Sequence, residues 1–238
     1  EFYPNTITKG YQGFVVSDYY ASLTPTSYEY DHGLLPDQLY VISKPLVKNR
    51  LLYCNDFNVS LAPAFRYQKA IDHQSRKYKT KKVIMIALPM LFHESRRLLD
   101  LVLGANLDSN IQFLVKRHPT VMMSKLMKNV KQANDPRLKY TERNLVDLMD
   151  ESTLLITMTS SAAIEAIICN TYVAIIANES QPTANPLKDI VDPEYWSVCY
   201  TSNDIVEAFN YSLNHRLLDN NEYLVPLTKK TLSNFMND

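Results

Sequence analysis

Three side chains that can carry positive charge follow directly on an apolar segment, in the order Lys116, Arg117 and His118. The preceding residues 111–115 (IQFLV) have the composition of a buried strand, which Pro119 would end. Cations at the carboxyl end of a strand can neutralise a phosphate group. The sequence therefore predicts phosphate binding here. The alternative is that the two long side chains are simply exposed and that His118 caps a local turn.

A second polar group, Thr159, Ser160 and Ser161, follows another apolar run and precedes Glu165 by one helical turn. A helix that begins on such a turn directs its first backbone N–H groups outward, where they favour an anion, most often a phosphate. The Glu165 carboxylate suits a ribose diol, because two neighbouring hydroxyls need an acceptor with two oxygens. By themselves, these residues equally fit an ordinary helix N-cap with an acidic first turn.

Alternating strands and helices supply the frame for both groups from residue 83 onward. Such alternation predicts a parallel sheet covered by helices on both faces, in the Rossmann-like α/β class. Ligands of these sheets bind outside the carboxyl ends of the strands, where both polar groups are expected. The expected strands are 83–89, 111–119, 137–141, 154–158, 172–177 and 196–200. The expected helices are 93–105, 124–133, 144–152 with Asn144 as N-cap, a short one after Ser161, and 203–218 capped by Ser202 and Asn203.

The N-terminal part of the chain is less regular. Strands are expected at 14–17, 38–43 and 58–64, and a helix at 44–54. The basic, polar segment 73–82 has no hydrophobic periodicity and is the candidate linker. We therefore expect a partial N-terminal lobe over 1–76 and a complete C-terminal lobe over 77–238. The first residue is Glu1 rather than Met, so the chain is expected to be a piece of a longer protein.

Composition excludes several classes of protein. The 238 residues carry a formal net charge of zero, which gives no electrostatic argument for nucleic acid, and no apolar run is long enough to span a membrane. The three scattered cysteines (54, 169 and 199) predict neither a disulfide framework nor a zinc site, and suit a reducing cytosol. None of the four glycines lies in a GxGxxG or GxxxxGK[ST] pattern, which counts against dinucleotide-binding enzymes and P-loop NTPases.

Taken together, the two polar groups resemble one known family. A strand ending in Lys-x-His-Pro (116–119), then a strand ending in Thr-Ser-Ser (159–161) before a helix with Glu-Ala, is similar to the nucleotide-binding C-terminal half of GT-B glycosyltransferases. The nearest resemblance is to Kdo transferases, polysialyltransferases and CDP-glycerol glycerophosphotransferases, which make bacterial surface and capsular carbohydrates. It covers about residues 30–200. The sequence departs from the family at Asn170 and Ser43, near which a glycine is usual, although asparagine tolerates a left-handed backbone.

The resemblance implies a GT-B fold, no metal and no cofactor, in keeping with the absence of a DxD motif. It implies transfer of a sugar from a nucleotide-sugar donor, with CMP- or CDP-linked sugars favoured, to a surface polysaccharide or glycolipid acceptor. In the N-terminal lobe, His32 of an HG element is the candidate catalytic base, and Asp18 and Glu29 are weaker options. His93 is a further candidate at the cleft, and the tyrosines of the N-terminal loop could stack on a sugar (Tyr19, Tyr20, Tyr28 and Tyr30). The donor residues implied are Lys116, Arg117, His118, Thr159, Ser160, Ser161 and Glu165.

Two other functions stay open at this point. One is a UDP-sugar 2-epimerase-like enzyme of the related two-lobed fold, and the other is a catalytically inactive GT-like binding module. The expected location is the cytoplasm, with peripheral association at the cytoplasmic face of the inner membrane as a further expectation and no nucleic-acid partner.

Overall fold

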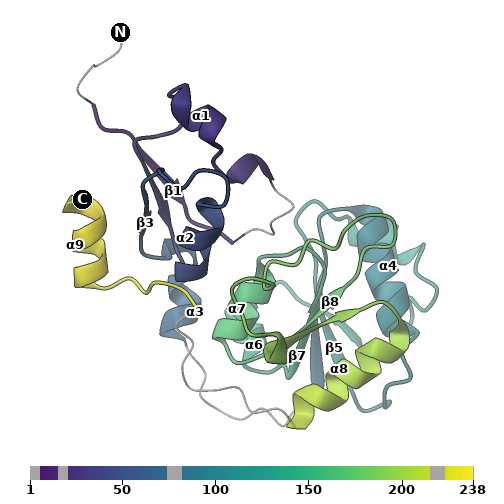
Figure 1. The fold of residues 1–238 in the computed structure, drawn as a ribbon. Coiled ribbons are helices and arrows are strands. Elements are labelled where there is room, and N and C mark those ends of the chain that lie inside the picture. The colour runs from purple at the N-terminus through teal and green to yellow at the C-terminus, as the bar shows by residue number, and fades with distance from the viewer. Residues whose placement is uncertain (1–5, 16–20, 74–81, 215–222, 238) are drawn as a thin grey trace. The chain divides into compact units, whose positions relative to one another are not determined.

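The structure, a computed structural model, describes residues 6–15, 21–73, 82–214 and 223–237 (Figure 1). Contacts divide the chain into two compact units. The first unit comprises Glu1–Lys69 together with Asn221–Asp238, and the second unit is Ala70–Asn220. The predicted division at 76/77 placed the last residues in the C-terminal lobe, whereas contacts group them with the first unit.

The second unit contains a six-stranded, fully parallel sheet in the order β6-β5-β4-β7-β8-β9. Along the chain, β5 pairs with one side of β4, and β6 pairs with the far side of β5. The next strand, β7, pairs with the opposite side of β4. The strand order therefore reverses between β4 and β7, which is the position where open α/β sheets bind ligands. The strands are β4 (Val83–Ala87), β5 (Gln112–Lys116), β6 (Leu138–Tyr140), β7 (Leu154–Thr157), β8 (Tyr172–Ile176) and β9 (Trp196–Cys199).

Helices cover both faces of this sheet (Figure 1). One face packs against α4, α5 and α8 in a continuous apolar core, to which Ile84 and Ile86 of β4 contribute. Met85, between them, is equally buried and faces the other side, near α6 and α7. Burial on both faces explains why the inner strands β4, β7 and β8 are apolar without alternation. The helices are α4 (Phe92–Leu103), α5 (Met123–Met127), α6 (Leu145–Met149), α7 (Ala162–Ile168) and α8 (Ser202–Asn214), with a 3-10 turn η3 (Pro193–Tyr195).

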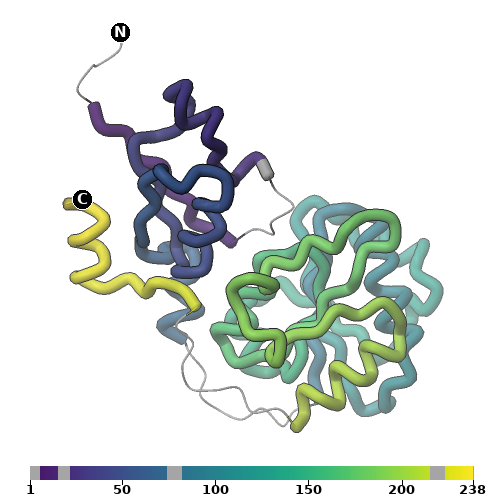
Figure 2. Tube along the Cα trace, viewed as in Figure 1, coloured from purple at the N-terminus to yellow at the C-terminus, as the bar shows by residue number. Residues whose placement is uncertain are grey.

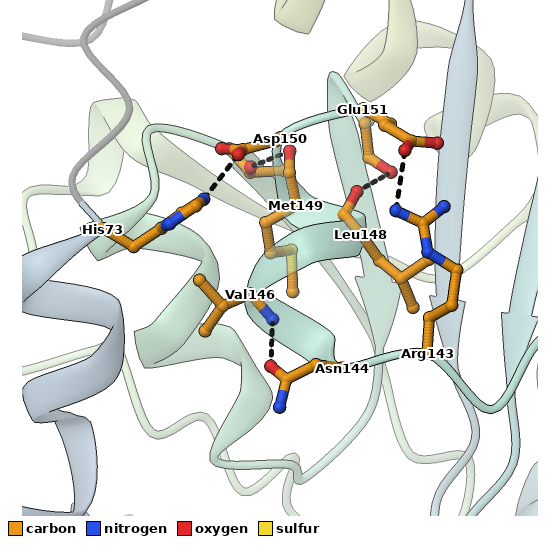
Figure 3. Close-up of polar contacts among 10 residues, drawn as sticks. His73, Arg143, Asn144, Val146, Leu148, Met149, Asp150 and Glu151 are labelled. Carbon is orange, nitrogen blue, oxygen red and sulfur yellow. Dashed lines mark hydrogen bonds and ion pairs between the residues drawn. The ribbon is translucent and has the colours of Figure 1, made fainter.

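Local chemistry at the helix ends confirms two predictions and corrects two. The Asn144 side chain accepts a hydrogen bond from the Val146 backbone N–H (3.1 Å; Figure 3), as expected for an N-cap. Asn170 takes the left-handed conformation, with φ of 53°. The predicted capping role of Ser202 is wrong, because its hydroxyl donates to the carbonyl of Leu101 (2.8 Å) and Asp204 instead accepts from the turn before the helix.

The predicted helix 124–133 is also too long. The α-helix stops at Met127, and the chain continues in turns, in which the Asn129 backbone N–H donates to the Leu126 carbonyl. The backbone N–H of Lys131 donates to Asp100 of α4 (3.0 Å). This tertiary bond replaces the helical one that continued winding would have formed.

The first unit contains a small parallel sheet in the order β1-β2-β3, formed by Lys9–Gln12, Gln38–Val41 and Val59–Leu61. The predicted strand at 14–17 is wrong for its described residues, because the polar segment Lys9–Gln12 pairs with β2 instead. Around the sheet lie α1 (Ser27–Asp31), α2 (Lys44–Arg50) and α9 (Lys229–Asn237), the 3-10 turns η1 (Ala21–Leu23) and η2 (Phe65–Tyr67), and α3 (Gln68–Asp72) at the boundary between the units.

The C-terminal segment packs within the first unit, beside the N-terminal strands (Figure 2). The backbone of Val225 donates to Ile42 (2.9 Å) and accepts from Ala64 (2.8 Å). The ring of Phe235 lies 4.9 Å from that of Tyr40 and 5.8 Å from that of Tyr11. These contacts join residues far apart in the chain and leave no local sequence pattern. The prediction from sequence therefore assigned this segment to the C-terminal lobe.

No helix in the described ranges has both the length and the apolar character that crossing a bilayer requires. All three cysteines are buried and free of disulfides.

Candidate functional site

Three loops reach the carboxyl edge of the large sheet side by side, because β4 lies between β5 and β7. They cover residues 88–91 after β4, 117–122 after β5 and 158–161 after β7. Neighbouring strands lie about 4.8 Å apart, so the outer two loops leave the sheet about 10 Å from each other. Both polar groups predicted from the sequence therefore flank the loop after β4.

Hydrogen bonds hold the three strand ends together. The Thr157 hydroxyl of β7 donates to the Ala87 carbonyl of β4 (3.0 Å) and is fully buried. The Leu88 backbone N–H extends the ladder on the other side by donating to the Lys116 carbonyl of β5 (3.0 Å). These two hydrogen bonds fix the ends of β4, β5 and β7 relative to one another, where the three loops begin.

His118 lies half-buried directly after β5 and has one partner residue for its ring. Its Nδ1 atom is 2.7 Å from the Thr120 hydroxyl, which is itself 3.2 Å from the Met90 carbonyl in the loop after β4. Nε2 makes no hydrogen bond to any of the residues that the structure describes. His118 is therefore tied to the neighbouring loop through one ring nitrogen and offers the other to a ligand.

Lys116 and Arg117 contact the loop that precedes α6. The Lys116 ammonium donates to the Arg143 carbonyl (2.7 Å), and the Arg117 guanidinium pairs with Glu142 (2.9 Å). The side chains of Arg117 and Glu142 are both exposed, so this ion pair contributes little to stability. Of the three residues predicted as a phosphate site, His118 is the one whose described contacts leave a ring nitrogen available.

The Thr-Ser-Ser turn lies where the sequence predicted it, between β7 and α7. Ser160 Oγ accepts from the Ala162 backbone N–H (3.2 Å), which leaves its own O–H to donate. Ser160, Ser161 and Glu165 are half-buried, and Thr159 is exposed. The hydroxyls and the carboxylate are thus within reach of solvent at the same edge as His118.

Helix α4 begins at the same edge. His93 is exposed in its first turn, and the buried Ser95 fastens that turn by donating to the Pro89 carbonyl (2.9 Å). Further along α4, Arg97 donates to the Ala177 carbonyl and pairs with Glu179 (2.8 Å), both in the loop after β8. Arg97 therefore holds the loop after β8 against α4, at the same edge of the sheet.

The sequence reasoning missed Thr120 and Arg97. Thr120 had a local signal, since a hydroxyl residue two positions after a histidine can bond its ring. Arg97 had none, because its partner carbonyl lies 80 positions away in the chain.

In the first unit, the predicted base His32 ends α1. Its Nδ1 lies 2.8 Å from the Tyr28 carbonyl, and the two rings stack at 4.1 Å. Glu29 accepts from the backbone and hydroxyl of Thr26 in a capping box (3.0 and 2.7 Å). Both residues therefore have local structural roles in α1. The candidates Asp18, Tyr19 and Tyr20 lie outside the described residues.

Among the described residues, the edge carries cations and hydroxyls rather than a cluster of metal ligands. Within the described ranges, no three His, Cys, Asp or Glu side chains come together in a way that could hold a metal ion. The chemistry available at the edge is accordingly that of hydroxyls, backbone N–H groups, imidazoles and nearby cations, which together suit an anionic ligand.

No family model and no curated protein sequence matches the chain. Solved structures do match. The crystal structure of TarM superimposes with a TM-score of 0.55 at 15% identity, covering 99% of this chain and 48% of TarM. The S. aureus MnaA-UDP co-structure gives 0.59 at 13% identity, covering 96% and 67%. The GtfA/B complex gives 0.52 at 12% identity, covering 95% and 49%.

These similarities show the fold. The chain has the parallel α/β architecture of GT-B glycosyltransferases, as the sequence predicted. The chain spans about half the length of the TarM and GtfA/B structures that it matches. The finer resemblance to Kdo transferases, polysialyltransferases and glycerophosphotransferases stays a prediction.

Proposed function

We propose that the second unit binds the phosphate of a nucleotide-sugar donor at the edge formed by the loops after β4, β5 and β7. One observation carries this proposal: His118 and Ser160 flank the loop after β4, at the point where the strand order reverses. A ligand above β4 would meet the His118 imidazole, which donates when it is protonated, on one side and the donating Ser160 hydroxyl on the other. Hydrogen bonds of this kind to a phosphate are charge-assisted and strong.

The remaining predicted residues have supporting roles in this proposal. Ser161 and Thr159 complete the hydroxyl-rich turn, and Lys116 and Arg117 add positive potential at slightly longer range because their heads contact the neighbouring loop. Glu165 accepts from the ribose hydroxyls. During transfer, donors on the phosphate would stabilise the negative charge that develops on the leaving nucleotide.

The reaction that we propose is transfer of a sugar from a nucleotide donor to a surface polysaccharide or glycolipid, without a metal. The GT-B fold supports it, as does the sequence resemblance to enzymes of surface carbohydrates. CMP and CDP are the favoured donor nucleotides. UDP is the rival, because the MnaA structure that the chain matches holds UDP. Strict UDP binding would overturn the CMP or CDP preference and keep the epimerase-like alternative open, since a TarM structure and the MnaA structure both hold UDP.

Calorimetric titration of the whole chain with CMP, CDP and UDP tests the donor site. Replacing His118 or Ser160 by Ala should weaken nucleotide binding roughly ten- to hundredfold, the equivalent of one charge-assisted hydrogen bond. Ser233→Ala, on the exposed face of α9, is the matched control and should leave affinity unchanged. If none of the three nucleotides binds at millimolar concentration, the donor-site proposal fails.

Two further variants separate binding from chemistry. Glu165→Gln should weaken CMP more than 2′-deoxy-CMP, because the second ligand lacks one of the hydroxyls that the carboxylate would accept from. His32→Ala should leave nucleotide affinity intact and abolish transfer if His32 is the base. Nucleotide binding with no transfer by the full-length protein would favour the inactive binding module.

A further inference from the structure

Thr120 forms a two-step hydrogen-bonded relay between His118 and the loop after β4. Its Oγ1 lies 2.7 Å from His118 Nδ1 and 3.2 Å from the Met90 carbonyl. A peptide carbonyl can only accept, so the bond to Met90 uses the single proton of the Thr120 hydroxyl. Oγ1 can then only accept from His118, which requires that Nδ1 carries a proton.

One competing arrangement exists in the same turn. The backbone N–H of Thr120 lies 3.3 Å from Nδ1 and could donate to it if Nδ1 were unprotonated. That contact is longer than the hydroxyl contact, and an unprotonated Nδ1 would compete with the Met90 carbonyl for the single hydroxyl proton. The relay satisfies both the ring and the carbonyl, so it is the favoured state.

We infer that Thr120 is a positioning residue that holds His118 as the Nδ1–H tautomer and makes Nε2 the atom that exchanges a proton at the ligand edge. In the neutral ring, Nε2 presents a lone pair. In the charged ring, it presents an N–H. Because an ionised phosphate oxygen accepts and does not donate, binding of an ionised phosphate to the neutral ring draws one proton from the solvent onto Nε2. This last step rests on the proposed function, whereas the tautomer does not.

Removing the hydroxyl should reverse the tautomer. In Thr120→Val, which keeps the shape of the side chain, Nδ1 loses its acceptor and can only accept from the backbone N–H of residue 120. The ring proton then moves to Nε2, which can donate to a phosphate without taking up a proton. Thr120→Ser keeps the hydroxyl and should behave as the wild type.

Long-range ¹H–¹⁵N NMR of the ligand-free chain tests the tautomer directly. Spectra are recorded at alkaline pH, where an unperturbed imidazole is neutral, and His118 is assigned by the signals lost in His118→Ala. We expect Nδ1–H in the wild type and in Thr120→Ser, and Nε2–H in Thr120→Val. An Nε2–H ring in the wild type, or an unchanged tautomer in Thr120→Val, would overturn the inference.

Titration with CMP at about pH 8, where its phosphate is ionised, in buffers of different ionisation enthalpy then measures proton uptake. We expect uptake for the wild type and for Thr120→Ser, and none for Thr120→Val. Proton uptake that is equal in all three proteins contradicts the role of Thr120. If none of CMP, CDP and UDP binds but the tautomers are as expected, the proposed function fails and the assignment of Thr120 stands.

Discussion

Arg97 of helix α4 pairs with Glu179 of the loop after β8 at 2.8 Å, and the same guanidinium donates to the Ala177 carbonyl. The two partners differ in exposure: 75% of the Glu179 side chain is accessible, whereas Ala177 is fully buried. One guanidinium therefore makes a weak surface ion pair and a bond to a carbonyl that has little access to water.

This difference predicts unequal costs of substitution. Glu179→Ala should lower the free energy of unfolding by less than about 1 kcal/mol, as expected of an exposed ion pair. Arg97→Ala should cost about 1–3 kcal/mol, because it leaves the Ala177 carbonyl without its donor. Urea unfolding of both variants checks the order, and equal losses would show that the carbonyl bond contributes nothing.

Capping by Asn144 should be measurable in the same way. Asn144→Ala removes the acceptor for the Val146 N–H (3.1 Å; Figure 3) and should cost about 1 kcal/mol. Asn144→Asp retains an oxygen at the same place and is the matched control, with stability within a few tenths of a kcal/mol of wild type. A loss of the same size in the aspartate variant would mean that the cap is not the cause.

The backbone of Asn170 makes a further prediction, since its φ of 53° is in the left-handed region. Asn170→Ala should destabilise by about 1 kcal/mol, because a Cβ without a polar group is disfavoured there. Asn170→Gly should be neutral or stabilising, because glycine adopts this conformation freely. Thermal unfolding of the pair provides the comparison, and a stable alanine variant would refute the backbone argument.

Asp135 should make the stability dependent on pH. Hydrogen bonds from Arg137 lower the pKa of the Asp135 carboxyl, and the Arg137 guanidinium also donates to the Leu107 carbonyl (2.9 Å) and lies 4.8 Å from the Phe113 ring centroid. Because the folded pKa is below the unfolded one, the stabilisation is present above the unfolded value of about 4 and is lost as pH falls towards the folded value.

The measurement is the urea midpoint at decreasing pH. The wild type should lose stability below about pH 4 more steeply than Asp135→Asn, which has no carboxyl to protonate. Asp108→Asn removes an exposed carboxylate that pairs with Lys82 and serves as the control, with a profile close to wild type. Parallel profiles for the wild type and Asp135→Asn would contradict the assignment.

Features that depend on residues close together in the chain could be predicted from the sequence. The inner strands of the second unit are predictable because burial on both faces makes them continuously apolar, as in Leu154–Thr157. The Asn144 cap and the Asn170 turn were found because each depends on the chemistry of one residue and its neighbours. The positions of His118 and Ser160 at one edge followed from the alternation of strands and helices.

What the sequence did not predict depends on partners far along the chain. Arg97 and the C-terminal segment are held by residues that no local pattern connects to them. The first strand was misplaced because Lys9–Gln12 is stabilised by pairing with β2 rather than by apolar composition. Lys116 and Arg117 lie at the end of β5 as predicted. Their contacts with residues 142 and 143 depend on the conformation of the loop before α6, which the sequence does not indicate.

Because residues 223–237 belong to the first unit, that unit consists of two separate segments of the chain. The second unit is inserted between them as one continuous segment. A gene fragment encoding only the front of the chain would lack Phe235, which packs against the rings of both Tyr11 and Tyr40. Of its ring contacts among the described residues, Tyr11 would keep only the one with Phe65. Residues 70–220, by contrast, form one uninterrupted cassette. The second unit can therefore be exchanged as one piece of chain, whereas the first unit needs both of its segments.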